Sequence, residues 1–140
     1  MLSSIRTRLQ GLGQFKLVSG AAQLEAASKT NPTADPAVFV YALSEQGTPS
    51  ATYSLVSQRV HVLVATVIAV KSVADAHGQA AVDALTPLRL QVRNSLLGYA
   101  PADFDPLEFD GGQLLAFQGG YVWWQDVWRS ATDINQTSQP

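Results

Sequence analysis

Apolar residues recur along the chain with two periods, one typical of helices and the other of strands. Near the N-terminus they fall every three or four residues, at Leu2, Ile5, Leu9 and Leu12. This spacing predicts a short amphipathic helix that ends near Gly11. A second helix is predicted over residues 21–29, where Ser19 can cap its start and Pro32 prevents its continuation. Between these helices, residues 15–18 are a candidate short strand.

Two strands are predicted in the middle of the chain. Residues 37–43 follow Pro36 and are apolar at both odd and even positions, which indicates an interior strand of a sheet. Residues 44–53 contain a glycine and a proline and are predicted to form a loop. A long strand follows, and Arg59 and His61 begin one of its faces. Its other face is apolar and is predicted to line the core, at Val60, Val62, Val64, Ile68 and Val70.

The main helix is predicted to begin at Asp75. Its apolar residues form one stripe at spacings of three and four, namely Val82, Leu85, Leu88, Val92 and Leu96. Gly98 stands where a C-terminal cap belongs. Pro87 cannot donate a hydrogen bond to the carbonyl of Asp83, so we expect either a kink there or two helical pieces.

Residues 107–133 hold all three tryptophans and two pairs of glycines. Gly111-Gly112 and Gly119-Gly120 can both adopt positive φ, which the common two-residue hairpin turns require. The sequence therefore predicts a β-meander of three strands that turns at these two pairs.

The third strand of this meander, residues 121–132, is unusual because both of its faces carry aromatic and aliphatic side chains. A half-buried strand should alternate apolar and polar residues. We therefore expect helices to cover one face and a neighbouring subunit to cover part of the other. Trp123 and Trp124 point to opposite faces, so one should pack beneath the helices and the other should contact a neighbour. The candidate interface residues are Arg59, His61, Trp123, Trp124, Asp126 and Trp128.

These elements predict an α+β fold, with a mixed or antiparallel sheet, helices packed mainly on one face and a C-terminal β-meander. Residues 1–133 are expected to form a single domain and residues 134–140 a flexible C-terminal tail. A chain of 140 residues is long enough for one real core.

Composition narrows the possible functions. Charged residues make up only 14% of the chain against ~25% on average, which fits either an alanine-rich protein or a subunit that hides surface in an assembly. A net charge of −2 without a basic block does not indicate nucleic-acid binding. The absence of cysteine excludes disulfides and thiolate chemistry. The longest apolar run, residues 60–70, is too short to span a membrane, and we expect neither a signal peptide nor a membrane anchor.

A search for catalytic chemistry finds little. The densest acidic cluster does not continue as a calcium-binding loop, because Pro106 interrupts it, and solvated turn carboxylates are the favoured reading. Its members are Asp103, Asp105, Glu108 and Asp110. His61 and His77 lack a third ligand at zinc spacing. No phosphate loop, dinucleotide fingerprint or nucleophile motif occurs. Asp126, among the tryptophans, could be an interface ion-pair partner, a buried carboxylate with a raised pKa or an exposed side chain at a sheet edge.

Four segments together carry a resemblance to a known family. They are V-S-Q-R-V-H-V-L-V-A-T-V-I-A-V-K-S-V-A-D-A-H-G at 56–78, L-x-x-L-R-x-x-V-R-x-x-L-L-G-Y at 85–99, L-E-F-D-G-G-Q-L-L at 107–115 and V-W-W-Q-D-V-W at 122–128. In this order they resemble the tail terminator family of long-tailed, siphovirus-type bacteriophages, especially versions from Mu-like and other transposable phages. The similarity covers nearly the whole chain, and none of its segments is a catalytic motif.

The resemblance implies a structural virion protein without enzymatic activity or cofactor. Such a protein would form a homo-hexameric ring, cap the tail tube, stop its polymerisation and provide the docking surface for the head connector. Its partners would be copies of itself, the tail tube protein and a head-completion or connector protein, at the neck of a virion assembled in the bacterial cytoplasm. Alternatives are another neck component, such as a head-completion or stopper protein, and more remotely a small metal-dependent enzyme.

Two irregular segments, residues 44–53 and 99–106, are expected to dock partners, because recognition residues concentrate on loops held by a rigid scaffold. Their acidic residues could meet a basic patch on a partner ring. The candidate docking residues are Glu45, Gln46, Tyr53, Asp103 and Asp105.

Overall fold

The structure is a computed structural model that describes residues 1–30, 32, 34–71 and 79–137. Within these residues the elements in chain order are α1 (Leu2–Gln10), β1 (Leu17–Ser19), α2 (Ala21–Lys29), β2 (Ala37–Gly47), β3 (Ser57–Lys71), α3 (Gln79–Leu96), β4 (Glu108–Gln118) and β5 (Tyr121–Asn135). The strands form one mixed sheet in the order β1-β2-β3-β5-β4, in which β1 is parallel to β2 and the other neighbours are antiparallel. The predicted α+β class is confirmed.

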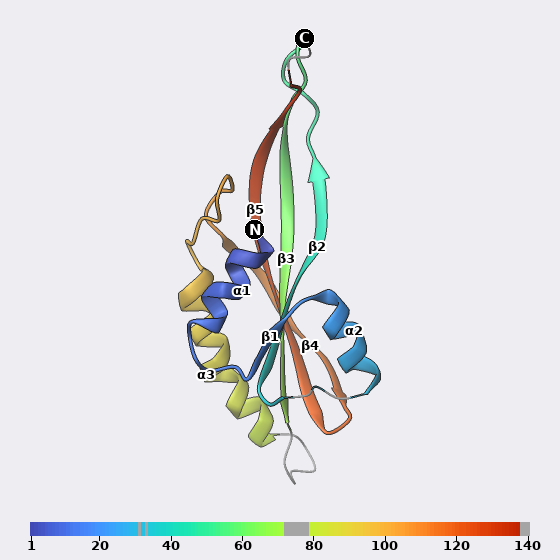
Figure 1. Cartoon of the computed structure of the whole chain (residues 1–140), viewed down its shortest axis with the longest axis vertical. Helices are drawn as coiled ribbons and strands as arrows, with labels where there is room; N and C mark the ends of the chain where they lie inside the picture. The colour runs from blue at the N-terminus through green and yellow to red at the C-terminus, as the bar shows by residue number, and fades with distance from the viewer. Residues whose placement is uncertain (31, 33, 72–78, 138–140) are drawn as a thin grey trace.

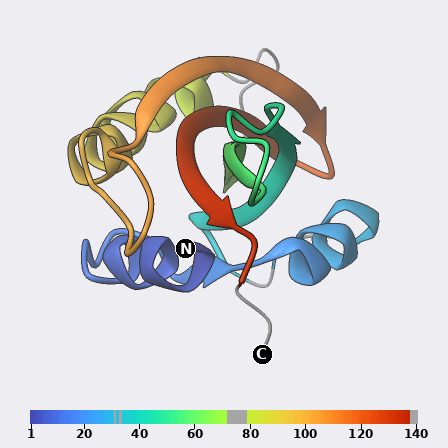
Figure 2. The same ribbon diagram turned by 90° about the horizontal axis from the view of Figure 1, so that it is seen from above.

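The two longest strands, β3 and β5, have fifteen residues each and pair along their entire length. Seen from above, the strands curl around the long axis of the molecule and the helices lie outside them (Figure 2). The helices surround only one part of the sheet, and the other part extends beyond them as a narrow projection (Figure 1). We call this projection, residues 44–63 and 129–137, the arm. The rest of the sheet with its three helices is the base.

Helices α1 and α3 cover one face of the base. Their buried residues are Ile5, Leu9, Leu85, Val92 and Leu96. They pack against even-numbered residues of the two long strands, namely Val64, Ile68, Val70, Val122 and Trp128. The apolar stripes predicted for these helices are confirmed, apart from Val82, which is exposed.

Helix α2 covers part of the opposite face of the base. Ala27 and Leu24 on α2 belong to a second apolar cluster, which also contains Phe39, Val67 and Trp123. Helices therefore cover parts of both faces of the base, and the contact of this second face with a neighbouring subunit stays a prediction. In the arm, by contrast, the sheet continues beyond all three helices (Figure 1).

A buried ion pair holds α3 against β5. Asp126 is 2% exposed, and its carboxylate accepts two hydrogen bonds from Arg89, from Nε at 3.1 Å and from Nη2 at 2.8 Å. Trp124 Nε1 donates a third bond to the same carboxylate at 3.0 Å, and the Arg89 guanidinium lies 4.3 Å from the centre of the Trp124 ring. Gly112 of β4 lies directly opposite Asp126 in the sheet. Three polar groups thus share one crowded space beneath the helix.

The predicted three-stranded meander is wrong, because β4 and β5 form a single hairpin. The hairpin turns at Gly119-Gly120, whose φ angles are 61° and 77°. Gly111-Gly112 lies inside β4, where the register shifts at a bulge. The second position of this pair requires a glycine because a Cβ atom there would overlap the side chain of Asp126, and not because the chain turns there.

The strands extend into the first residues of two segments that were expected to be irregular. β2 includes Glu45 and Gln46, because a bulge at Leu43 shifts the register and lets pairing with β3 resume beyond it. β5 continues through Ile134 and Asn135, the first two residues of the predicted flexible tail, which pair with the start of β3.

The helix ends differ from the expectations in detail. α3 is one helix through Pro87, whose ring lies on the exposed side of the helix, so the prediction of two pieces is wrong. Gly98 follows α3 with a φ of 81°, as expected of a cap. Ser19 ends β1 and does not cap α2, which has a glycine at its capping position. Asp75 and His77 lie outside the described residues.

We expect Gly112→Ala to destabilise the protein. A Cβ atom at this position would overlap Asp126 Oδ1 and would lie 3.1 Å from Arg89 Nη2 and 3.2 Å from Trp124 Nε1. Overpacking of this kind costs about 1–3 kcal/mol of unfolding free energy, which urea denaturation can measure.

Gly111→Ala is the matched control, because it is the neighbouring glycine of the same strand and a Cβ there meets nothing within 4 Å. It should leave stability within about 0.5 kcal/mol of the parent or raise it slightly. Equal destabilisation by both substitutions would contradict this explanation. It would show that the loss of stability comes from replacing any glycine of this strand, and not from the overlap with the Asp126 carboxylate.

Candidate interaction surfaces

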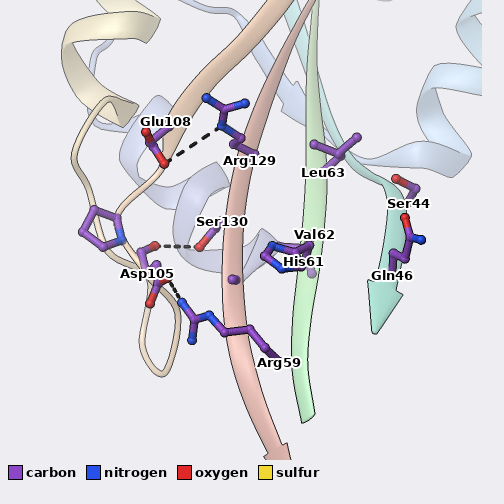
Figure 3. A pocket seen from close by; sticks show the side chains of 12 residues that line it. Ser44, Gln46, Arg59, His61, Val62, Leu63, Asp105, Glu108, Arg129 and Ser130 are labelled. Atoms are coloured by element: carbon purple, nitrogen blue, oxygen red, sulfur yellow. Dashed lines mark hydrogen bonds and ion pairs between the residues drawn. The ribbon is translucent and has the colours of Figure 1, made fainter. Parts of the chain in front are cut away.

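A pocket on the arm brings together four of the residues singled out from the sequence. The pocket has a volume of about 310 Å³. Gln46 on β2, Arg59 and His61 on β3, and Asp105 in the loop before β4 all line it (Figure 3). The sequence had assigned these residues to two separate sites, a subunit interface and a docking loop. The structure places them in one, which we call the arm pocket.

Arginines neutralise the carboxylates around the arm pocket. The Arg59 side chain reaches across β5 and pairs with Asp105 on the far side, as Figure 3 shows, and its Nη1 lies 3.0 Å from Asp133 Oδ1. Arg129 lies 3.4 Å from Asp110 and 4.0 Å from Glu108.

Hydrogen bonds join the loop over residues 99–106 to residues 130–132 of β5, a part of this strand that does not pair with β4. The backbone N–H of Asp105 donates to the carbonyl of Ala131 at 2.8 Å. Ser130 Oγ donates to the carbonyl of Asp105 at 2.6 Å, and Thr132 Oγ1 donates to the carbonyl of Asp103 at 2.5 Å. These bonds fix the backbone of the predicted docking loop while its two carboxylates stay at the surface.

The chemistry of the arm pocket suits protein contacts. Among the residues that the structure describes, no three potential metal ligands come together, and the acidic cluster faces arginines instead. Arg59 and Arg129 are 38% and 54% exposed, and exposed ion pairs contribute only about 0.2–1 kcal/mol each. A partner with complementary charges could therefore replace these pairs at little loss to the fold.

Three of the predicted interface residues lie inside the subunit. Trp124, Asp126 and Trp128 all point to the face covered by α1 and α3, and Trp128 is only 1% exposed. Its Nε1 donates to Thr66 Oγ1 at 3.1 Å, and its ring meets Phe109 edge-on at 5.5 Å. Asp126 is not exposed at a sheet edge but buried, and its ion-pair partner Arg89 belongs to the same chain. Asp126 and Trp128 therefore offer almost no surface to a neighbouring molecule, and Trp124 is partly covered by the helices.

Trp123 points to the opposite face, as the alternation predicts, and stacks on Phe39 with 6.2 Å between the ring centres. It lines an apolar groove of about 420 Å³ between α2 and the β4–β5 hairpin. The other lining residues are Ala21, Leu24, Glu25, Ser28, Tyr41, Leu115, Ala116 and Gln118. We call this the α2 groove. This groove was not predicted from the sequence, because a bulge near Leu115 sets the register of β4 there.

Tyr41 forms part of the wall of the α2 groove. Its hydroxyl donates to Gln125 Oε1 at 2.6 Å. Burial raises the pKa of this phenol above its ordinary value of 10.0. The side chain therefore stays protonated and keeps its hydrogen bond at neutral pH, so the groove wall carries no charge at this position.

The far end of the arm is exposed and apolar. Tyr53, from the predicted docking loop, is fully exposed, and three aliphatic side chains near it are about half exposed. Gln136 N–H donates to the carbonyl of Val56 at 2.7 Å, which joins the loop to the end of β5. We call this surface, formed by Tyr53, Leu55, Val56 and Ile134, the apolar tip.

Charge is distributed unevenly between the two ends of the molecule. The arm, with the adjoining loop and the start of β4, carries only Arg59 and Arg129 as basic residues. Its acidic residues are Glu45, Asp103, Asp105, Glu108, Asp110 and Asp133. The rest of the described chain, without this loop and the start of β4, has the opposite balance. Its basic residues are Arg6, Arg8, Lys16, Lys29, Lys71, Arg89 and Arg93, and its acidic residues are Glu25, Asp35, Asp83 and Asp126.

The chain is a small α+β protein whose described surface includes the charged arm pocket, the apolar α2 groove and the apolar tip. None of the described helices is long and apolar enough to cross a membrane. Residues 2–139 match the model of the phage tail terminator protein family, and the chain belongs to this family. It is a structural family, and the protein is thus a virion component of a bacteriophage tail. No curated protein matches the chain.

Proposed function

We propose that this chain forms a hexameric ring on the end of the phage tail tube, stops tube polymerisation and then provides the docking surface for the head connector. The observation that carries the proposal is the match to the tail terminator family over residues 2–139. A match along nearly the whole chain favours a terminator over another neck component, such as a head-completion or stopper protein.

The architecture supports a role in which different surfaces meet different partners. A ring subunit in the neck needs contacts with copies of itself, with the tube and with the head side. The chain offers at least three surfaces that differ in chemistry: the charged arm pocket, the apolar tip and the apolar α2 groove. We assign docking of the head connector or the tail tube to the arm pocket and its loop, because their carboxylates are exposed on a fixed backbone.

Addition of the purified chain to polymerising tail tube protein of the same phage should shorten the tubes as the concentration of the chain rises. A cap that binds the growing end removes that end from elongation, so tube length should depend on the ratio of chain to tube protein. Electron microscopy gives the length distribution. Tubes of unchanged length in the presence of folded chain would contradict the proposed function.

The double variant Asp103→Asn and Asp105→Asn should leave the subunit folded but weaken head joining. The loop is held mainly by backbone bonds, and the exposed pair of Asp105 with Arg59 contributes less than about 1 kcal/mol to stability. Phages that carry the variant should yield free heads and tails in excess, or tails of irregular length, counted by electron microscopy.

Asp83→Asn is the control, since it removes one exposed carboxylate from α3 in the base. It should leave particle assembly normal. Normal, infectious particles from the double variant would exclude the acidic loop from the docking surface.

A further inference from the structure

We propose that copies of this chain assemble through the two free edges of the sheet, so that β4 of one copy pairs with β2 of the next. The proposal rests on the proposed function only in that the copies assemble with one another. It assigns the self-contact to two strands of the chain, and the partner of each free edge is a second copy.

The outer edge of β4 is free and almost unprotected. β4 is the last strand of the sheet, and within the described residues no backbone hydrogen bond outside its ladder with β5 involves residues 108–118. Charged side chains commonly protect such an edge from pairing with another chain. Here Glu108 and Asp110 stand only at the start, and residues 111–118 carry no charge.

This edge strand also leaves apolar side chains uncovered on both of its faces. Leu114 and Phe117 lie opposite Trp124 and Val122 on the face of α3, and they are 44% and 54% exposed. Leu115 lines the α2 groove on the other face. Figure 2 shows β4 on the outside of the curled sheet. A helix would cover one face only, whereas an added strand brings side chains beside its neighbour on both faces.

The opposite edge of the sheet is free over a similar length. β1 pairs only with Ala37–Phe39 of β2. Beyond it, residues 41–47 of β2 pair with β3 on one side, and within the described residues no other backbone hydrogen bond involves them. Residues 42–47 are exposed, and Glu45 is the only charged residue of this stretch. The chain therefore carries two different free edges that can satisfy each other.

The strand directions favour a second copy as the partner. β2, β3, β5 and β4 are each antiparallel to the next, so β4 runs opposite to β2. A ring axis that runs along the strands leaves their direction unchanged from copy to copy. β4 beside β2 of the next copy then continues the antiparallel order, which is the slightly more stable pairing. Such a contact between different edges is heterologous and generates a ring when the rotation closes, whereas two identical edges would stop at a dimer.

The two edges also match in register. β2 has a bulge at Leu43 and β4 has one at Leu115; both leucines are 43% exposed, and both line pockets on the face that carries α2. An antiparallel register that brings Leu43 opposite Leu115 places residues 111–117 opposite residues 41–47. Glu45 then lies opposite an uncharged residue. This register covers both leucines and brings no like charges together.

Engineered cysteines test the contact directly, because the chain has none of its own. Leu43→Cys and Leu115→Cys are purified separately, one with an affinity tag, so that every mixed disulfide dimer joins two copies. After mixing and mild oxidation, the mixed dimer should form in at least tenfold greater yield than from Leu43→Cys with Leu90→Cys. Leu90 is the matched control, since it is 52% exposed on α3 and belongs to neither edge.

A yield of mixed dimer no greater than in the control mixture would overturn the proposal. So would oxidised products made up only of homodimers of either variant. If the unmodified chain still shortens tail tubes in that case, the proposed function stands and only the assignment of the self-contact fails. Efficient cross-linking of a chain that leaves tube length unchanged would support the edge contact and contradict the proposed function.

A charge exchange gives a second measurement that does not depend on cross-linking. Leu115→Lys places an unpaired charge on the exposed edge, so the melting temperature should stay close to that of the parent. The concentration at which rings appear, followed by native mass spectrometry, should rise at least tenfold. Addition of Leu43→Asp to the same chain places opposite charges across every contact and should return this concentration to within about threefold of the parent.

Rings that Leu115→Lys weakens and Leu43→Asp does not restore would overturn the pairing of these two edges. Rings of unchanged stability with Leu115→Lys would also overturn it. If those rings no longer bind the tail tube, the tube protein is the partner of the β4 edge.

Discussion

The pairing of β3 with β5 over fifteen residues is the constraint on which the rest of the structure depends. In the base, this pair forms the floor of both apolar clusters, with even-numbered residues beneath α1 and α3 and odd-numbered residues beneath α2. In the arm, the same two strands continue without helices. One ladder of backbone hydrogen bonds therefore transmits a fixed geometry from the buried core to the exposed tip, and a shift of one residue would exchange the two faces along the whole length.

The elements around this pair are fixed by a few specific contacts. Arg89, whose side chain is 25% exposed, and the buried Asp126 attach α3 to β5, and Gly112 provides the room for their side chains. Burial of such a pair does little for net stability, but removal of one partner is costly, so it defines where the helix sits. The exposed pairs of Arg59 and Arg129 have the opposite character, since they can be exchanged for contacts with a partner. Fixed contacts in the base and replaceable ones on the arm fit a subunit of an assembly.

The sequence predicted elements that depend on local periodicity and failed where distant contacts decide the outcome. The helical stripes of α1 and α3, the core face of β3 and the opposite directions of Trp123 and Trp124 follow from spacing alone. Gly111-Gly112 resembled a hairpin turn, because nothing local reveals that the second glycine faces a buried carboxylate from another strand. The bulge at Leu43, which extends β2 through Glu45 and Gln46, is equally invisible in the sequence. The arm pocket was partly foreseen, since Gln46, Arg59, His61 and Asp105 were all candidates, but their convergence required the sheet register. The α2 groove needed the folded hairpin and was missed.

Imaging of the head-proximal end of phage tails by cryo-electron microscopy tests the central claim most directly. The account predicts one hexameric ring of this chain on the last ring of the tail tube. A tail end without this chain, or a chain located elsewhere in the virion, would contradict its assignment as the terminator.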